Sequence, residues 1–265
     1  MDHKKGKLIV FEGIEGSGKT TQVSMLADRM KKGGFSVLST REPTSEFKFG
    51  KLARAIYAAE SLQETVRGEL KNLFQAEEYY SMKKAAHNDK LIHVNRFENI
   101  AEELLKNPVE DVVSLLQIAI TLDRHDHIIE MIRPALDGGT FVLSDRYFAS
   151  TPAYSSANGA DWRPFLKMQY EILGKEFIFP DLMVVLDIPV DTGIERTLTK
   201  QRDKREYFDT VKRQEKIQRA YHEIIADQAV KEKIKIFEVD GGLSPETIHN
   251  RIWDETQTIL AGENK

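Results

Sequence analysis

One segment near the amino terminus, Gly13–Thr20 (GIEGSGKT), constrains the fold more than any other part of the sequence. It follows the apolar run Leu8–Phe11 and precedes a helix-like stretch that ends near Lys32. Glycines in this setting let the backbone curl so that successive N–H groups point into one hollow, and the first N–H groups of the following helix add a positive dipole end. The sequence therefore predicts a strand, a phosphate-binding loop and a helix, in that order.

The spacing G-x-x-x-x-G-K-[ST] also predicts roles for individual side chains. Lys19 can reach the β- and γ-phosphates of a nucleoside triphosphate, and the Thr20 hydroxyl can ligate Mg²⁺. We expect Lys19 to face solvent as a phosphate contact. A chance match in a glycine-rich turn is the alternative, and the strand before and the helix after argue against it. The residues expected to bind ATP are Gly13, Glu15, Gly16, Ser17, Gly18, Lys19, Thr20 and Thr21.

Short apolar runs alternate with longer amphipathic stretches along most of the 265 residues. The runs are nearly continuous and rich in β-branched and aromatic residues, as expected of parallel strands that are buried on both faces. This rhythm predicts one α/β domain over residues 1–265, a P-loop NTPase fold with a five-stranded parallel sheet covered by helices. The predicted strands are Lys7–Glu12, Ser36–Thr40, Thr140–Asp145, Leu182–Asp187 and Ile234–Val239. The predicted helices are Lys19–Lys32, Gly50–Ala59, Val112–Asp137, Arg163–Leu173, Val190–Lys200, Asp209–Val230 and Pro245–Ala261.

One stretch interrupts this rhythm. From about Glu60 to Asn107 the sequence has no strand signal, charges are dense, and large apolar residues such as Leu70 and Phe74 recur at roughly helical spacing. We therefore predict an extra helical insertion over residues 60–111 within the domain.

Charged residues stand at the ends of two predicted strands. STREP follows the second strand and LSDRY closes the third, and ligands of open α/β sheets bind beyond the carboxyl ends of the strands. Asp145 is placed to hold a Mg²⁺-bound water, and Arg41 and Arg146 can fork onto phosphate oxygens. The alternative is that Asp145 caps the next turn and that Arg146 pairs with Glu42 at the surface.

Taken in order, several motifs resemble those of the thymidylate kinase family. They are the phosphate loop, TREP, LDRHDHIIEMIRPALDGG, VLSDRYFASTPAY, PDLMVVLDI and the basic RDKRE, and they cover nearly the whole chain apart from about Glu60 to Asp111. The resemblance implies a nucleoside monophosphate kinase that passes the γ-phosphoryl group of Mg·ATP to a monophosphate, with dTMP favoured. It also implies a homodimer.

The same resemblance implies roles for residues on the acceptor side. Arg124 corresponds to an arginine that contacts the nucleobase, and Arg146 to the arginine that holds the acceptor phosphate. Tyr154 corresponds to a tyrosine near the deoxyribose, and Asp145 to an acid near the metal and the phosphates. Arg54 falls close to a second acceptor-phosphate arginine, one residue late.

A basic segment at residues 199–208 is the predicted lid over the triphosphate. The phosphate loop carries Gly16 rather than an arginine, which by the resemblance implies that the lid supplies the catalytic arginine. Arg202 and Arg205 are the candidates, beside Lys19 and Asp145 in the phosphate loop and strand end. A solvated charged turn is the alternative.

The sequence departs from the family pattern at several positions. Ile120 stands four residues before Arg124, where the family stacks a phenylalanine on thymine, so we expect Ile120 to pack on the base without an aromatic face. Glu15 replaces the usual aspartate of the loop, and Thr-Ser at 44–45 replaces Gly-Gly. We expect Phe74 or Tyr79 of the insertion to complete the wall of the base pocket.

Composition excludes several classes of protein. With 38 basic and 42 acidic residues the formal net charge is −4, which gives no general affinity for nucleic acid. There is no cysteine, and therefore no disulfide, thiolate catalysis or Cys-ligated metal. No apolar run approaches the roughly 18 residues of a membrane span. We expect a cytoplasmic protein without nucleic-acid or membrane partners.

Two alternative functions stay open at this point. A deoxynucleoside kinase would act on a 5′-hydroxyl and needs a general base, for which Glu42 is the candidate. A non-catalytic regulatory protein would bind ATP as a ligand and use the insertion as a partner surface.

Overall fold

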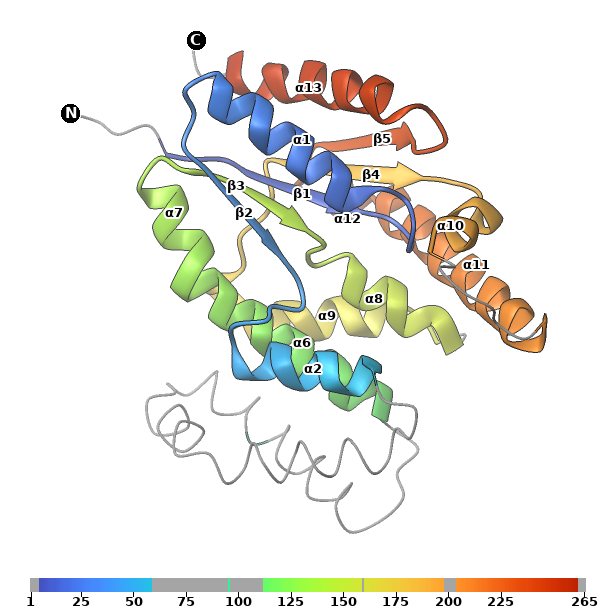
Figure 1. Cartoon of the computed structure of the whole chain (residues 1–265). Helices are drawn as coiled ribbons and strands as arrows, with labels where there is room; N and C mark the ends of the chain where they lie inside the picture. Colours follow the sequence, from blue (N-terminus) through green and yellow to red (C-terminus); the bar gives the residue numbers. More distant parts are fainter. Residues whose placement is uncertain (1–4, 59–94, 96–111, 159, 198–203, 262–265) are drawn as a thin grey trace. The chain divides into compact units, whose positions relative to one another are not determined.

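The computed structural model describes residues 5–58, 95, 112–158, 160–197 and 204–261 (Figure 1). Five strands form one sheet in the order β2-β3-β1-β4-β5, and every neighbouring pair is parallel. This confirms the predicted α/β fold with a five-stranded parallel sheet. The strands are β1 (Leu8–Glu12), β2 (Val37–Arg41), β3 (Phe141–Asp145), β4 (Leu182–Asp187) and β5 (Ile236–Asp240).

The register of the sheet brings the carboxyl ends of its first three strands to one edge. Phe11 of β1 is opposite Asp145 of β3, and Asp145 is in turn opposite Arg41 of β2. The three central strands are buried almost throughout, whereas the edge strands β2 and β5 are partly exposed. Burial on both faces explains why the central strands read as continuous apolar runs.

Helices alternate with the strands along the chain (Figure 1). The helices on the amino-terminal side of β3 are α1 (Lys19–Lys32), α2 (Lys48–Ala58), α6 (Val112–His127) and α7 (Arg133–Asp137). Those after β3 are α8 (Ser150–Ser155), α9 (Arg163–Leu173), α10 (Val190–Thr197), α11 (Lys204–Ala226), α12 (Gln228–Lys231) and α13 (Pro245–Ala261). None of the helices in the described ranges is long and apolar enough to cross a membrane.

The chain packs as two compact units. Unit 1 comprises residues 1–41, 132–166 and 178–265, and holds the sheet with most of the helices. Unit 2 comprises residues 42–131 and 167–177, and in it α2 packs against α6.

The main core of unit 1 lies between one face of the sheet and the helices α1 and α13 (Figure 1). Alternate residues of the strands point to this face, as Ile9 and Phe11 do in β1. The helices contribute apolar residues at spacings of three and four, which is one helical stripe. These residues are Val23, Leu26, Ala27 and Met30 of α1 and Ile248 and Ile252 of α13.

Several predicted helices have different ends in the structure. The predicted helix Val112–Asp137 contains a π-helical turn at Ile128–Ile132, just before Pro134, whose ring has no N–H for the regular ladder. The predicted helix Asp209–Val230 begins earlier, at Lys204, and stops at Ala226. There the Asp227 carboxylate caps a new helix by accepting from the N–H groups of residues 229 and 230.

Other predictions fall partly or wholly outside the described residues. The insertion at 60–111 lies outside them apart from Asn95, and so do Phe74 and Tyr79. Of the predicted lid, residues 199–203 including Arg202 lie outside, whereas 204–208 form the first turns of α11.

Truncation of the core should destabilise the protein strongly. Leu26 of α1 is fully buried in the main core, so Leu26→Ala should lower the free energy of unfolding by about 2–5 kcal/mol in urea titrations. Ser24→Ala on the exposed side of the same helix is the control and should change it by less than about 0.5 kcal/mol. Equal losses for both variants would contradict the described orientation of α1.

Candidate active site

The phosphate loop joins β1 to α1 through three glycines with positive φ. These angles are 138° at Gly13, 73° at Gly16 and 96° at Gly18, a region that side chains disfavour. Gly18 is the N-cap of α1 and offers no side chain to the free N–H groups of the first turn. The amino end of α1 is therefore open to an anion, as the sequence predicts.

A close backbone contact with α10 fixes the other side of the loop. A methyl group added at Gly193 would lie 2.6 Å from the carbonyl oxygen of Glu15, and one added at Gly16 would overlap the Gly193 carbonyl. Neither position has room for any side chain. The sequence analysis did not identify Gly193, because its partner is remote in the chain.

Lys19 lies inside the loop, so the expectation that it faces solvent is wrong. Its side chain is 6% exposed, and Nζ donates to the carbonyl oxygens of Gly13 (3.0 Å) and Ile14 (2.7 Å) and to Ser17 Oγ (3.2 Å). Burial lowers the pKa of Lys19 to about 7, and the nearby Arg146 guanidinium acts in the same direction. Three acids oppose these effects in part, namely Asp145, Glu12 and Glu15.

Thr20 and Asp145, the two predicted metal residues, are in direct contact. The Thr20 hydroxyl donates to Asp145 Oδ2 over 2.5 Å, although the residues are 125 positions apart in the chain. A hydroxyl and a carboxylate oxygen are hard ligands of the kind that Mg²⁺ prefers. The pair therefore fits a magnesium ion held at the end of β3.

Arg146 adopts a strained backbone conformation beside this pair. Its φ is 75°, the one positive value recorded for a non-glycine residue in the described ranges, and such a conformation costs about 1–3 kcal/mol. The guanidinium carbon lies 4.8 Å from the ring centre of Tyr154, and Nη1 is buried without a hydrogen-bond partner among the described residues. The structure thus brings together two of the predicted acceptor residues, Arg146 and Tyr154.

The Arg146 guanidinium is strongly held in its charged form. Burial by itself lowers its pKa, but four surrounding groups outweigh burial and raise the pKa above its ordinary value. These groups are Tyr154, Tyr221, Asp145 and Glu12. Glu12 was not among the predicted site residues; it is the last residue of β1 and is fully buried. The sequence signal that could have identified Glu12 is a charged residue at the end of an apolar run, directly before the first glycine of the loop.

The remaining predicted residues of unit 1 lie at the rim of the loop or beyond. Glu15, Thr20 and Thr21 are exposed, as is Arg41 at the end of β2. Arg205 is in the first turn of α11. An unpredicted arginine, Arg196 of α10, donates to the carbonyl oxygens of Gly241 (3.0 Å) and Gly16 (3.4 Å).

Unit 2 holds a buried polar cluster around Arg124. Its guanidinium is fully buried and pairs with Glu42, with Nη2 at 2.6 Å and Nε at 2.7 Å from Oε2, and it also donates to Gln169. His127 Nδ1 lies 3.0 Å from the other oxygen of Glu42. Burial acts to raise the pKa of Glu42, but Arg124 and His127 outweigh burial, so the pKa is lowered. Glu42 is thus a fixed anion inside unit 2, not a surface partner of an arginine.

A second cluster in unit 2 explains one departure from the family pattern. The N–H and the hydroxyl of Thr44 donate to the two oxygens of Asp123, over 2.8 and 2.6 Å. A methyl group on Gly50 would lie 2.6 Å from Asp123 Oδ1, so the three residues pack without space. Arg54 donates to the carbonyl oxygens of Thr44 (3.0 Å) and Pro43, which ties α2 to the same turn. Ile120 of α6 is buried, 6% exposed.

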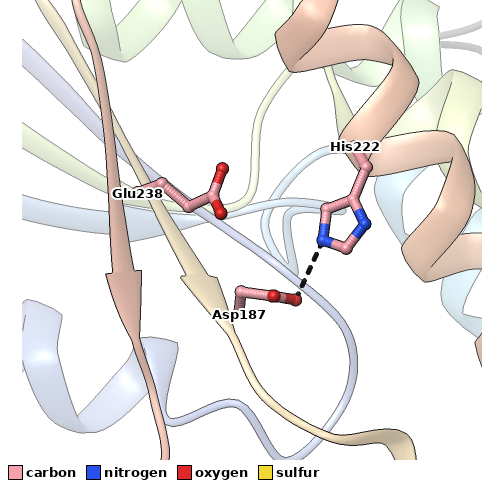
Figure 2. Close-up of side chains that lie close together, drawn as sticks. All are labelled: Asp187, His222 and Glu238. Carbon is pink, nitrogen blue, oxygen red and sulfur yellow. Dashed lines mark ion pairs between the residues drawn. The ribbon is translucent and has the colours of Figure 1, made fainter.

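A further group of polar side chains comes from β4, β5 and α11. Figure 2 shows Asp187, His222 and Glu238, whose potential metal-ligating atoms lie within 4.8 Å of one another. His222 Nε2 already pairs with Asp187 Oδ1 at 3.1 Å, and Gln218 donates to the same oxygen over 2.7 Å. A pocket of about 360 Å³ adjoins them. His222 and Glu238 are exposed, and exposed acidic groups commonly lie together without a metal, so these three residues carry no assignment as a metal site.

Fold and site together define an ATP-dependent phosphotransferase of the P-loop class. A family model described as thymidylate kinase matches residues 11–97 and 94–252. The chain is 31% identical to the thymidylate kinase of Bradyrhizobium sp. (strain ORS 278) over 97% of this chain and 92% of the relative. It is 30% identical to that of Thermomicrobium roseum over 95% of both chains, and 31% identical to a probable thymidylate kinase of Thermococcus gammatolerans over 82% of this chain and 81% of the relative.

The chain therefore belongs to the thymidylate kinase family, as the resemblance indicated. Members of this family are phosphotransferases with a phosphate group as acceptor. Kinship with these relatives supports the prediction of an ATP-dependent dTMP kinase and favours neither alternative function.

The contact between α10 and the loop leads to a prediction about Gly193. Alanine is the better helix former by about 1 kcal/mol, so Gly193→Ala should not unfold α10. Its methyl group would nevertheless displace the loop at Glu15, and we expect the dissociation constant of ATP to rise by about tenfold or more in calorimetric titrations. Gly33→Ala is the control, because its methyl group would lie 3.3 Å from the nearest atom and its φ is −79°. Unchanged ATP affinity in Gly193→Ala would show that the contact does not shape the loop.

Proposed function

We propose that this chain transfers the γ-phosphoryl group of ATP to the phosphate of dTMP and produces ADP and dTDP. An oxygen of the dTMP phosphate attacks the γ-phosphorus, and the bond from that phosphorus to the β,γ-bridging oxygen breaks. The bridging oxygen leaves with the electron pair, as part of ADP. The acceptor is already an anion, so positioning and charge stabilisation dominate the rate acceleration.

The observation that carries this proposal is the placement of Arg146 beside the phosphate loop. A permanently charged guanidinium, with one buried nitrogen that has no hydrogen-bond partner among the described residues, lies close enough to Lys19 to lower the pKa of that lysine. The positive charge of Arg146 disfavours the charged form of Lys19 unless anions separate the two groups. A triphosphate at Lys19 and an acceptor phosphate at Arg146 supply such anions.

On the donor side, the loop and the amino end of α1 would hold the triphosphate. Lys19 would exchange its bonds to the loop carbonyls for bonds to the β- and γ-phosphates. Mg²⁺ would be held through Thr20 and Asp145, and when bound it neutralises charge on the donor oxygens. Arg202 or Arg205 would complete the charge stabilisation from the lid, and closure of the lid would exclude water as a competing acceptor.

On the acceptor side, Arg146 would bind the dTMP phosphate and Tyr154 would lie near the deoxyribose. Arg41 is a further candidate for phosphate contact. Base recognition would involve Ile120 and Arg124, with Glu42 and Gln169 fixing the guanidinium. Arg54 would act through the turn at Pro43 and Thr44, since its Nε and Nη2 already donate there.

The family resemblance also supports three proposals about the protein's surroundings. These are a homodimer, Mg²⁺ as the metal, and a cytoplasmic location. A deoxynucleoside kinase is less well supported, because its candidate base Glu42 has a lowered pKa and both oxygens engaged.

Removal of the Arg146 guanidinium should impair the reaction with dTMP but leave the affinity for ATP nearly unchanged. In assays with Mg·ATP and a panel of nucleoside monophosphates, the wild-type chain should act best on dTMP. Arg146→Ala should lower kcat/KM for dTMP by about 10²–10³-fold, while the dissociation constant of ATP changes by less than about threefold.

Arg163→Ala is a matched control for this experiment. Arg163 also lies 4.8 Å from an aromatic ring, that of Trp162, but it is exposed and paired with Asp161. It should leave all constants unchanged. Turnover of no monophosphate by the wild-type chain would contradict the kinase, and loss of ATP binding in Arg146→Ala would contradict the assignment of Arg146 to the acceptor.

A further inference from the structure

The proposed mechanism gives no task to the most completely buried carboxylate beside the phosphate loop. Glu12 is 0% exposed, and burial of a carboxylate is unfavourable unless donors surround it. Its Oε1 accepts from the N–H groups of Tyr147 (2.9 Å) and Ser150 (3.3 Å). Its Oε2 accepts from the hydroxyls of Ser150 (2.6 Å) and Tyr221 (3.0 Å). Burial raises the pKa of Glu12, although these donors and the nearby Arg146 act to lower it. The four hydrogen bonds, all to fixed donors, indicate that the carboxyl group has a structural partner to hold.

That partner is the peptide group that joins Arg146 to Tyr147. Glu12 accepts from the N–H of this peptide group, and on its other side Ser144 Oγ donates to the Arg146 carbonyl oxygen over 2.7 Å. The N–H of Arg146 itself donates to the Phe11 carbonyl oxygen over 2.9 Å. The planes of the two peptide groups that flank a Cα atom set its φ and ψ, so these three bonds together define the conformation of Arg146.

The conformation so defined is the unfavourable one. A left-handed arginine persists only where surrounding bonds over-determine it. We propose that Glu12 is a positioning residue that keeps Arg146 left-handed, and thereby directs its guanidinium over Tyr154 toward the acceptor phosphate. This inference rests on the proposed function, in which Arg146 binds that phosphate.

The same carboxylate reaches the helix that begins within the lid segment. Tyr221 of α11 donates to Glu12 and lies 2.8 Å from Ser150 Oγ, so one buried carboxyl group joins β1, the turn after Arg146, and α11. The backbone directly after Arg146 and the helix α11 are thus both hydrogen-bonded to Glu12. Loss of Glu12 should therefore affect acceptor binding and catalysis more than ATP affinity.

A double-mutant cycle tests this proposal. Glu12→Ala should lower kcat/KM for dTMP by about 100-fold, since misplacement of a binding group by an ångström has effects of that size. Glu12→Gln should recover about tenfold of this, because its amide oxygen can still accept from Tyr147 N–H. In both variants the dissociation constant of ATP should change by less than about threefold. In an Arg146→Ala background, Glu12→Ala should cause less than about a threefold further loss, because the group it positions is absent.

Two further variants control for a general loss of stability. Ser144→Ala frees the other side of the same peptide group and should lower kcat/KM for dTMP in the same direction as the Glu12 variants. Thr256→Ala removes an equally buried hydroxyl, which donates within α13 to Ile252, and should leave dTMP kinetics unchanged. If Glu12→Ala does not fold, the cycle is carried out with Glu12→Gln and Ser144→Ala.

The proposal would be overturned if Glu12→Ala lowered kcat/KM for dTMP by the same factor in the wild-type and Arg146→Ala backgrounds. A Ser144→Ala variant with wild-type dTMP kinetics would also overturn it. The dissociation constant of dTMP, measured by calorimetry beside turnover, keeps the two proposals separate. A wild-type chain that binds dTMP without turnover contradicts the proposed function, whereas the same cycle in dTMP affinity still tests the role of Glu12.

Discussion

Burial of two ionisable side chains beside the phosphate loop is the constraint on which the rest of the site depends. Within eight residues the chain buries an acidic side chain, Glu12, and a basic one, Lys19, on either side of a glycine-rich loop. Each group has different hydrogen-bond partners. Glu12 takes donors from segments remote in the sequence, whereas Lys19 takes acceptors from the loop itself. The loop is therefore held in shape before any phosphate arrives.

This arrangement explains why the site should attract anionic ligands. A buried ammonium bound to neutral carbonyls is only partly compensated, which is why its pKa is lowered to about 7. Arg146 adds a second positive charge in a strained backbone conformation. An anionic ligand would compensate both the Lys19 ammonium and the added positive charge of Arg146. Preorganised positive charge of this kind is also what stabilises a phosphoryl group during transfer.

The fold and the conformation of the phosphate loop followed from the sequence because their signals are local. The glycine spacing, the apolar runs and the Lys-Thr pair all lie within short segments, and the predicted strands and the helices Lys19–Lys32, Arg163–Leu173 and Pro245–Ala261 agree with the structure to within two residues. What could not be predicted depends on remote partners. Gly193 matters because of Glu15, Glu12 because of Tyr221, and the short helix α8 has no apolar period of its own.

In unit 2, which holds several predicted acceptor residues, the contacts between remote residues could not be predicted from the sequence either. Thr44 looked like a departure from the family pattern, but its hydroxyl and N–H together hold Asp123, a residue of the LDRHDH motif for which no role was predicted. Burial raises the pKa of Asp123 to about 6, with the Thr44 hydrogen bonds opposing the shift. Glu42, considered as a general base, proved to be the anion that fixes Arg124. In both cases the type of residue could be read from the sequence, but the residue that it contacts could not.

The central claim is that the loop holds Lys19 partly neutral and that a bound triphosphate recharges it. The most direct test is the number of protons taken up on ATP binding, from calorimetry at pH 8 in buffers of different ionisation enthalpy. With a pKa of about 7 in the free protein, roughly nine-tenths of Lys19 is neutral at pH 8, so uptake should approach one proton per ATP and fall as the pH is lowered through 7. Lys19→Arg stays charged and should take up none. Equal uptake by the wild-type chain and Lys19→Arg at pH 8 would contradict the account.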